Sequence, residues 1–254
     1  MGKNSAIPWT DHTFNPWHGC QKIGGRRACS NCYAEAFAKR TGHNIWGASQ
    51  PRRFFGEKHW TEPLKWNKAA IGAARKPRVF CMSMGDLFEN RSDLVEPRSR
   101  AFSLMHQTPH LEWLLLTKRI RNVVGMVDAT PWRWPHNARL GITIGTQEDA
   151  WEDLPVLADV CAANKWSNFV SIEPCLEAID LGPTVDHLDW AICGCESRGS
   201  RLGRPLQLDW VRSLRDQCQA AGTPFFYKQG PVDGKLVELP ELDGRVWAEV
   251  PGAK

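Results

Sequence analysis

Three cysteines near the start of the chain have the spacing of metal ligands. Cys20, Cys29 and Cys32 form a C-x8-C-x2-C pattern, in which the C-x2-C pair brings two thiolates to one metal centre and the preceding loop returns a third. A structural zinc ion takes four protein ligands, and an iron–sulfur cube held only by protein takes four cysteines. The set therefore indicates a [4Fe-4S] cluster with one iron left for a ligand that is not protein. The amino and carboxylate groups of S-adenosylmethionine (SAM) are such a ligand.

A zinc site is the alternative that the spacing leaves open. His18, His12 or a distant cysteine would complete it, and the spacing alone favours zinc and an iron–sulfur centre about equally. In this alternative the chain is a zinc-stabilised nucleic-acid-binding protein without catalysis. Polar residues at the ends of the predicted strands, described below, favour the cluster.

Composition is that of an ordinary globular protein. The chain has 254 residues, 42% of them apolar and 24% charged, which is enough for one α/β-barrel-sized domain or two small domains. No apolar run is long enough for a membrane span, and the N-terminus lacks the apolar region of a signal peptide. We expect a cytoplasmic protein with no membrane partner. Nine cysteines in such a chain indicate metal ligands or buried thiols rather than disulfides.

Positive charge is concentrated in the N-terminal third. Residues 1–80 hold 14 Lys and Arg against 4 Asp and Glu, a balance of +10, whereas the remaining residues hold 18 against 24, a balance of −6. Arg26, Arg27, Arg52 and Arg53 lie in or near the cysteine loop, which predicts a polyanionic partner such as nucleic acid. A solvated basic face without a partner is the equally favoured alternative. The 13 tryptophans offer stacking platforms for bases, although packing is the commoner use of such residues.

Apolar strands and amphipathic helices alternate along most of the chain. We expect strands at 79–83, 112–117, 139–144, 168–172, 189–193 and 224–227. We expect helices at 31–40, 63–75, 94–107, 119–127, 147–164 and 208–221. Ser30 is the predicted N-cap of the first helix, which would place the C-x2-C thiolates at a helix N-terminus. This alternation predicts the α/β class, with a parallel sheet built from βαβ units in a barrel, and a hairpin or loose end after residue 231.

Polar residues follow each predicted strand. In a parallel barrel, active-site residues gather at the C-terminal ends of the strands. The polar stretches at these ends are 83–86, 117–119, 143–148, 173–174, 194–198 and 228–230. Any one of them alone is more often a helix cap or a solvated loop. Six in succession favour an enzyme.

The succession of motifs resembles a known family. WTDHTFNPWHGC, CSNCYAE, CMSMGDLF, LLLTKR, LGITIGTQE, SIEP and CGCESRGSR resemble, in this order, the phage-associated three-cysteine-motif family of radical-SAM-like proteins. The resemblance covers about residues 7–230. It implies a partial (β/α)6 radical-SAM-type barrel, with parallel strands and outer helices, over residues 1–230, the cysteine loop at 20–32 and a C-terminal extension at 231–254. It also implies a [4Fe-4S] cluster on Cys20, Cys29 and Cys32, SAM bound across the strand ends, and an electron donor as a partner.

Roles for the remaining site residues follow from the resemblance and from their order along the chain. The predicted cofactor-binding residues are Ser83, Gly85, Asp86, Lys118, Thr143 and Glu173. Among them, Gly85 and Asp86 would meet the methionine ammonium, Lys118 the carboxylate of SAM, and Thr143 and Glu173 the ribose hydroxyls. The predicted catalytic residues are Lys118, Glu196 and Lys228, of which the last two would face the substrate with Arg198 and Gln229.

Four further cysteines depart from the family pattern. Cys193 and Cys195 stand where the family usually has other residues at the end of the strand expected at 189–193, and Cys81 and Cys175 replace small or apolar residues. We expect them to be small buried residues, with radical chemistry or a second cluster as alternatives. The predicted function is a radical SAM enzyme that generates a 5′-deoxyadenosyl radical and repairs or modifies nucleic acid. Alternatively, it acts on a protein or peptide presented by a partner protein.

Overall fold

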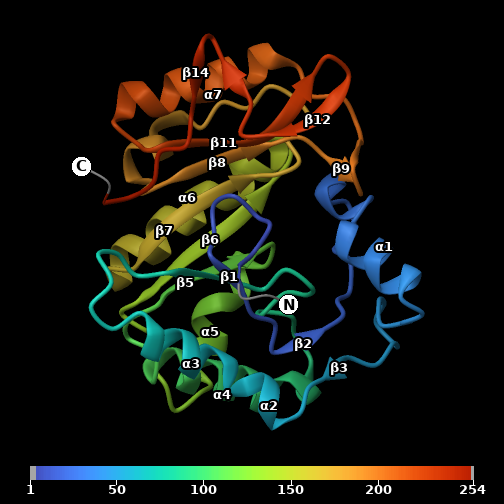
Figure 1. Cartoon of the computed structure of the whole chain (residues 1–254), viewed down its shortest axis with the longest axis vertical. Helices are drawn as coiled ribbons and strands as arrows, with labels where there is room; N and C mark the ends of the chain where they lie inside the picture. Colours follow the sequence, from blue (N-terminus) through green and yellow to red (C-terminus); the bar gives the residue numbers. More distant parts are fainter. Residues whose placement is uncertain (1–3, 253–254) are drawn as a thin grey trace. The chain divides into compact units, whose positions relative to one another are not determined.

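A computed structural model describes residues 4–252 and shows an eight-stranded, mostly parallel sheet (Figure 1). Its strand order is β1-β4-β5-β6-β7-β8-β11-β12. These strands are β1 (His12–Thr13), β4 (Arg78–Cys81), β5 (Glu112–Thr117), β6 (Ala138–Ile144), β7 (Ser167–Ile172), β8 (Ala191–Gly194), β11 (Phe225–Val232) and β12 (Lys235–Glu238). β1 pairs with β4, β4 with β5, β7 with β8 and β8 with β11 in parallel, whereas β12 is antiparallel to β11. The predicted α/β class is confirmed.

Helices alternate with the strands of the sheet. They are α1 (Tyr33–Arg40), α2 (Glu57–Trp60), α3 (Glu62–Ala69), α4 (Val95–His106), α5 (Val123–Asp128), α6 (Gln147–Asn164) and α7 (Leu208–Ala221). The chain divides into two compact units. The first unit comprises Met1–Ile23 and Ala34–Leu140, and the second comprises Gly24–Tyr33 and Gly141–Lys254.

The first unit contains the parallel strands β1, β4 and β5. Trp113, Leu114 and Leu115 on β5 are fully buried, because a parallel strand is covered on both faces and so carries a continuous apolar run. The unit also has a small antiparallel pair, β2 (Trp17–His18) with β3 (Arg53–Phe54). β2 lies just before Cys20 in the sequence, and its pairing with β3 holds the chain there.

The second unit contains β7, β8 and β11, with α7 beside β11 (Figure 1). Its longest helix, α6, begins after Thr146, whose Oγ1 accepts a hydrogen bond of 3.2 Å from the Asp149 N–H. α6 ends at Lys165, and α7 ends at Gly222, each in the left-handed conformation that closes a helix. Both helices have the bounds predicted from their apolar periodicity and end signals.

The first helix begins later than predicted. Arg27–Cys29 forms a turn of 3-10 helix, and the Ser30 N–H closes it with a bond of 3.2 Å to the Arg27 carbonyl. Ser30 has helical dihedral angles (φ −62°, ψ −50°) rather than the extended ones of an N-cap. The prediction of a helix from residue 31 with Ser30 as its cap was therefore wrong. Cys29 lies in the 3-10 turn, and Cys32 directly precedes α1.

Residues after the last parallel strand pack onto the second unit. The expected boundary at residue 231 falls inside β11, which pairs with β12. β13 (Glu241–Leu242) pairs with β14 (Arg245–Val246), and the nearby Trp247 ring is buried with its N–H donating 3.2 Å to the Leu242 carbonyl. The segment is therefore part of the fold rather than a loose end.

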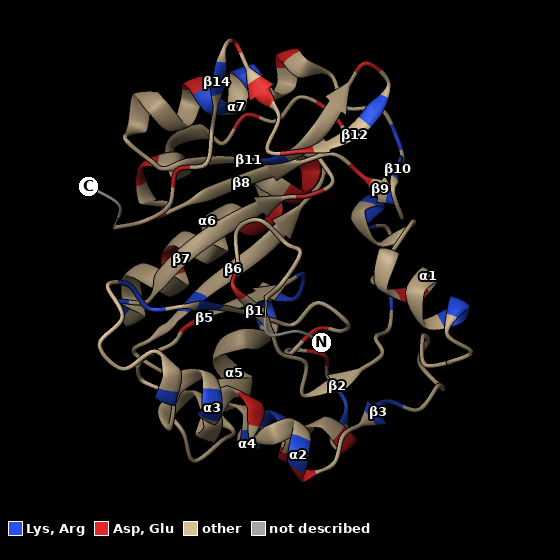
Figure 2. Cartoon of the chain, viewed as in Figure 1, with Lys and Arg blue, Asp and Glu red and all other residues tan. Residues whose placement is uncertain are grey.

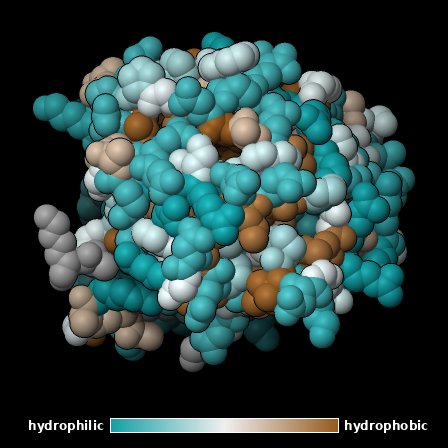
Figure 3. All heavy atoms as spheres, turned by 90° about the horizontal axis from the view of Figure 1, so that it is seen from above, coloured by the Kyte–Doolittle hydropathy of each residue, from teal (hydrophilic) through white to brown (hydrophobic). Residues whose placement is uncertain are grey.

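The surface seen in Figure 3 is mostly hydrophilic, with apolar residues in small separate groups. Within residues 4–252, no helix combines the length and the apolar character needed to cross a membrane.

Candidate cofactor site

The three predicted metal ligands are divided between the two units. Cys20 belongs to the first unit, and Cys29 and Cys32 lie in the segment 24–33 of the second. All three are free thiols, Cys29 buried and the other two half-buried. Over residues 4–252, no three His, Cys, Asp or Glu side chains are grouped as ligands of a metal ion. The ligand set stays a prediction.

Cys20 lies beside a guanidinium. Nη1 of Arg119 is 3.7 Å from Sγ of Cys20, and the same side chain donates 2.5 Å to the Gln21 carbonyl and 2.7 Å to the Asp86 carboxylate. The Gln21 N–H donates 3.0 Å to Glu89. Burial raises the pKa of Cys20 to about 12, Asp86 and Glu89 act in the same direction, and Arg119 opposes them. The surroundings of Cys20 therefore oppose loss of its thiol proton, which metal binding requires.

Asp86 organises the loop that holds Arg119. Its Oδ1 accepts from the Thr117 hydroxyl at 2.7 Å and from the Phe88 N–H at 3.0 Å. Its Oδ2 accepts from the Lys118 N–H at 3.1 Å and from Arg119 at 2.7 Å. Four donors match the four acceptor positions of a carboxylate, so Asp86 joins the ends of β4 and β5. Contact of Asp86 with the methionine ammonium, and the roles assigned to the Lys118 side chain, stay predictions.

Ser83 and Gly85 lie in the same loop. Asn15 binds this loop through a 3.2 Å bond from its amide nitrogen to the Ser83 hydroxyl and a 2.7 Å bond from the Met84 N–H to its oxygen. A Cβ on Gly85 would lie 2.9 Å from the carbonyl oxygen of Gly19, the residue before Cys20. Glycine is therefore required for this close approach, beside any role that it has toward a cofactor.

Acidic residues anchor the cysteine segment 24–33 in the second unit. Arg26 is 14% exposed and pairs with Asp149 at 2.6 Å and with Asp153 at 2.8 Å, both from α6. Arg27 pairs with Glu177 at 2.8 Å. The two arginines thus fix the turn that carries Cys29. Their charge has a structural role here, whereas the sequence pattern predicted contact with a polyanionic partner.

Glu196 holds the same segment from the other side. Its buried carboxylate accepts from the Asn31 amide at 3.1 Å and from the Arg204 N–H at 3.0 Å, and Arg204 also donates 3.0 Å to the Arg27 carbonyl. Burial opposes the ionisation of Glu196, but the hydrogen bonds from Arg204 and Asn31 lower its pKa below the ordinary value. Glu196 therefore positions the residues between Cys29 and Cys32, and its predicted catalytic role stays a prediction.

Glu173 and Lys228, both predicted site residues, are brought together. Nζ of Lys228 lies 2.9 Å from Oε1 of Glu173, close enough for an ion pair but outside hydrogen-bond geometry. Thr143 is buried, and its hydroxyl has no hydrogen-bond partner among the residues that the structure describes. A Cβ on Gly194 would lie 2.6 Å from Oε1 of Glu173. The Thr143 hydroxyl and Oε1 of Glu173 are both buried, and neither has a hydrogen-bond partner among the described residues.

The four additional cysteines are buried, as predicted. Cys81, Cys175, Cys193 and Cys195 are at most 3% exposed. A hydrogen bond with the Cys175 side chain, followed by burial, raises the pKa of Cys193, and burial raises that of Cys195 to about 11. The four cysteines are therefore small core residues.

Much of the N-terminal positive charge is neutralised within the protein. Arg52 is completely buried and pairs with Glu89 at 2.5 Å, just as Arg26 and Arg27 pair with carboxylates of the second unit. Arg53 is exposed, and its guanidinium contacts the His43 ring at 2.7 Å. The excess of basic residues is thus a weaker sign of a polyanionic partner than the count alone suggests.

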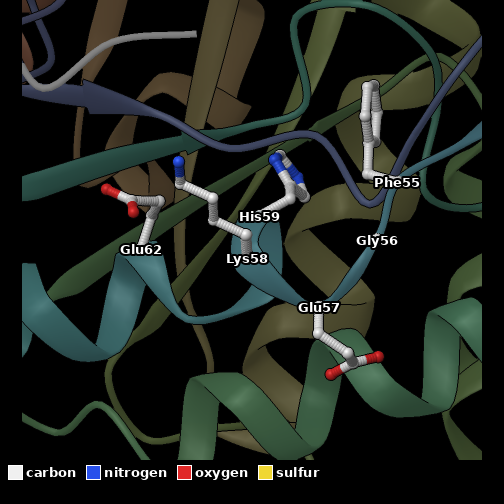
Figure 4. Close-up of a pocket in the computed structure, with 6 residues that line it drawn as sticks. All are labelled: Phe55, Gly56, Glu57, Lys58, His59 and Glu62. Atoms are coloured by element: carbon white, nitrogen blue, oxygen red, sulfur yellow. The ribbon is translucent and has the colours of Figure 1, made fainter.

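A surface pocket in the first unit is lined by residues other than the predicted cofactor-binding ones. Phe55, Gly56, Glu57, Lys58, His59 and Glu62 line it (Figure 4). Glu57 pairs with Arg100, and Glu62 pairs with Lys65 at 2.6 Å. With both carboxylates paired and no predicted site residue in its lining, this pocket is not the predicted cofactor site.

Comparison with known proteins identifies the family. The family described as "Protein of unknown function (DUF5131)" matches residues 4–251. The chain belongs to this family. A search of curated proteins finds no match.

Among solved structures, the chain is similar to a cysteine-to-serine mutant of spore photoproduct lyase. The TM-score is 0.54 at 12% identity, over 87% of this chain and 76% of that one. At this identity the likeness shows the fold alone. It confirms the predicted partial α/β barrel of the radical-SAM type.

Sequence reasoning missed the residues that hold the cysteines in place. These are Asn31, Glu89, Arg119 and Arg204, of which Arg119 was visible as part of the polar end of β5. Spacing cannot show which member of Thr117, Lys118 and Arg119 turns toward Cys20. The pairing of distant residues such as Arg204 with Arg27 has no local signal at all.

Proposed function

We propose that this chain is a radical SAM enzyme that binds a [4Fe-4S] cluster through Cys20, Cys29 and Cys32. One observation carries the proposal: a chain with this three-cysteine spacing has the fold of spore photoproduct lyase, a radical SAM enzyme. A three-thiolate set leaves one iron open for SAM.

The residues present fit these groups chemically. Three free thiols supply the three protein ligands of an open cluster. Arg119 beside Cys20 offsets the charge of a thiolate and provides an N–H donor to its sulfur, which is a usual means of tuning a cluster. The unpartnered hydroxyl of Thr143 and the Oε1 atom of Glu173 suit the hydroxyl groups of a sugar.

A cluster held by Cys20, Cys29 and Cys32, with SAM bound, would supply one-electron reductive cleavage of the sulfonium and hydrogen-atom abstraction. The residues of the chain perform the supporting tasks. Asp86 orients Arg119 against Cys20, and Glu196 with Arg204 orients the segment between Cys29 and Cys32. Thr143 and Glu173 bind and orient the ribose of SAM.

For the substrate we propose nucleic acid, repaired or modified at a base. Support comes from arginines of the N-terminal third that have no carboxylate partner in the described chain, which are treated in the next subsection. A base inside a duplex would have to be extruded, whereas a base in a single strand is directly accessible. A protein or peptide presented by a partner protein is the competing substrate, and binding of an oligonucleotide separates the two.

Cleavage of SAM by the reconstituted protein tests the proposal. We expect anaerobic reduction in the presence of SAM to release 5′-deoxyadenosine. Cys20→Ser, Cys29→Ser and Cys32→Ser should each lower that release at least 100-fold. Cys161→Ser is the matched control, because Cys161 is a buried thiol on α6 outside the motif, and it should retain the release. Unchanged release in the three motif variants, or equal loss in the control, would contradict the assignment of the ligands.

A further inference from the structure

We propose that a basic aromatic surface on the first unit binds single-stranded nucleic acid. This surface consists of Phe37, Arg40, His43, Arg53 and Phe54. This surface would be the docking site for the nucleic-acid substrate, and that role rests on the proposed function. The binding itself involves no cofactor, so it can be tested separately.

The positive charge of this surface is not neutralised by the protein. Residues 36–56 contain no Asp or Glu. Arg40 and Arg53 are both exposed, and among the described residues neither has a carboxylate within ion-pair distance. In the same unit Arg75 pairs with Asp11 at 2.7 Å, and Arg100 pairs with Glu57. Arg40 and Arg53 therefore remain available to phosphate groups.

Two exposed aromatic rings accompany these arginines. Phe37 is 43% exposed and Phe54 is 46% exposed, so each keeps a large part of its ring in solvent. The Arg40 guanidinium lies 5.4 Å from the centre of the Phe37 ring, which keeps cation and aromatic face together. Exposed aromatic rings beside arginines are the usual elements of stacking platforms for unpaired bases.

The two halves of the surface are physically connected. The His43 N–H donates 2.8 Å to the Ala38 carbonyl at the end of α1, and the His43 ring contacts Arg53 at 2.7 Å. β3, which carries Arg53 and Phe54, is held by β2. Figure 2 shows basic residues at the end of α1 and on β3. The end of α1 and β3, which carry Phe37 and Phe54, are thus linked through His43.

Single strands fit this arrangement better than duplexes. A single strand exposes base faces for Phe37 and Phe54 together with phosphates for Arg40 and Arg53, whereas a duplex hides the base faces in its stack. Stacking on phenylalanine and contacts with phosphates do not depend on which base is bound, so we expect little dependence on sequence. DNA and RNA share the required chemistry, and the test therefore includes both sugars.

Fluorescence anisotropy with labelled dT15 and rU15 tests the proposal on the full chain, purified without reconstitution. We expect Arg40→Gln/Arg53→Gln to weaken binding at least tenfold and to reduce the slope of log K against log salt by about 1.4, because about 0.7 ions are released per phosphate contact of a single strand. Phe37→Ala and Phe54→Ala should each weaken binding about tenfold. Arg133→Gln and Trp151→Ala, at an exposed arginine and at a tryptophan that is 73% exposed, are the matched controls and should bind normally.

The outcomes separate the possible explanations. Loss in both the arginine and the phenylalanine variants, with normal controls, supports the proposal. Unchanged affinity in the arginine pair, or equal loss in the controls, would overturn it. Loss limited to the arginine pair would also overturn it, because that result indicates a general polyanion surface without stacking. Cys29→Ser should bind the oligonucleotides normally, since binding does not need the cofactor. A failure of oligonucleotide binding therefore leaves the cofactor assignment standing, and a failure of SAM cleavage leaves the binding surface standing.

Discussion

Replacing Arg52 should destabilise the first unit strongly. The Arg52 side chain is fully buried and donates to both oxygens of Glu89, at 3.0 and 2.5 Å, and to the Gln50 carbonyl at 2.8 Å. Glu89 is itself 2% exposed and also accepts from the N–H of Gln21, the residue after Cys20. Arg52→Gln leaves this carboxylate buried without its cation, which costs roughly 3–5 kcal/mol. The same change should loosen the chain on either side of Cys20.

Urea unfolding followed by tryptophan fluorescence measures this effect. Arg53→Gln is the matched control, since the neighbouring arginine is exposed and has no carboxylate partner in the described chain, and it should change the free energy of unfolding by less than about 0.5 kcal/mol. Arg52→Met combined with Glu89→Leu should recover most of the loss, because no charge is left unpaired. A loss below about 1 kcal/mol in Arg52→Gln, or a double variant no more stable than the single one, would refute the reasoning.

Three further predictions concern the loops around the cysteines. Glu196→Gln should speed amide hydrogen exchange in residues 24–33. Because the pKa of Glu196 is lowered, the same acceleration is expected in the wild type as the pH falls from the ordinary carboxyl pKa of 4.5 through the pKa of the folded protein. Exchange that is independent of both the mutation and the pH would be contrary evidence. Thr143→Val should change the free energy of unfolding by less than about 0.5 kcal/mol but weaken SAM binding about tenfold. Thr117→Val removes a 2.7 Å bond to Asp86 and should cost about 1–3 kcal/mol of stability. Urea unfolding measures stability and calorimetry measures SAM affinity, and an unchanged SAM affinity in Thr143→Val would count against its role. Gly85→Ala should lower the free energy of unfolding by about 1–3 kcal/mol, because the new Cβ meets the Gly19 carbonyl. Gly125→Ala, with open space around it on α5, is the control and should be neutral or stabilising. Similar unfolding midpoints for the two variants would contradict the packing argument.

Local patterns predicted most of the secondary structure. β5, α6 and α7 have the predicted bounds, because continuous apolar strands and regular helix periodicity are encoded within a few residues. The start of α1 was predicted wrongly because serine is also common in turns, and here Ser30 closes a 3-10 turn.

The site was less predictable than the fold. Spacing identified Cys20, Cys29 and Cys32, but it could not show that they are divided between two compact units. Charge counts predicted a basic face, whereas Arg26 in fact pairs with acidic residues more than 120 positions away in the sequence. Such long-range pairings depend on the tertiary fold and leave no local pattern. The positions of Thr143 and Glu173 at strand ends followed from the barrel pattern, while their remaining hydrogen-bonding capacity required the structure.

The metal content of anaerobically purified protein tests the central claim most directly. The radical SAM assignment predicts about four irons and four sulfides per chain after reconstitution, little zinc, and an electron paramagnetic resonance signal of the reduced protein that changes when SAM is added. Cys161→Ser should give the same iron content, and Cys29→Ser should lose most of it. One zinc per chain with no iron, or a spectrum indifferent to SAM, would contradict the account.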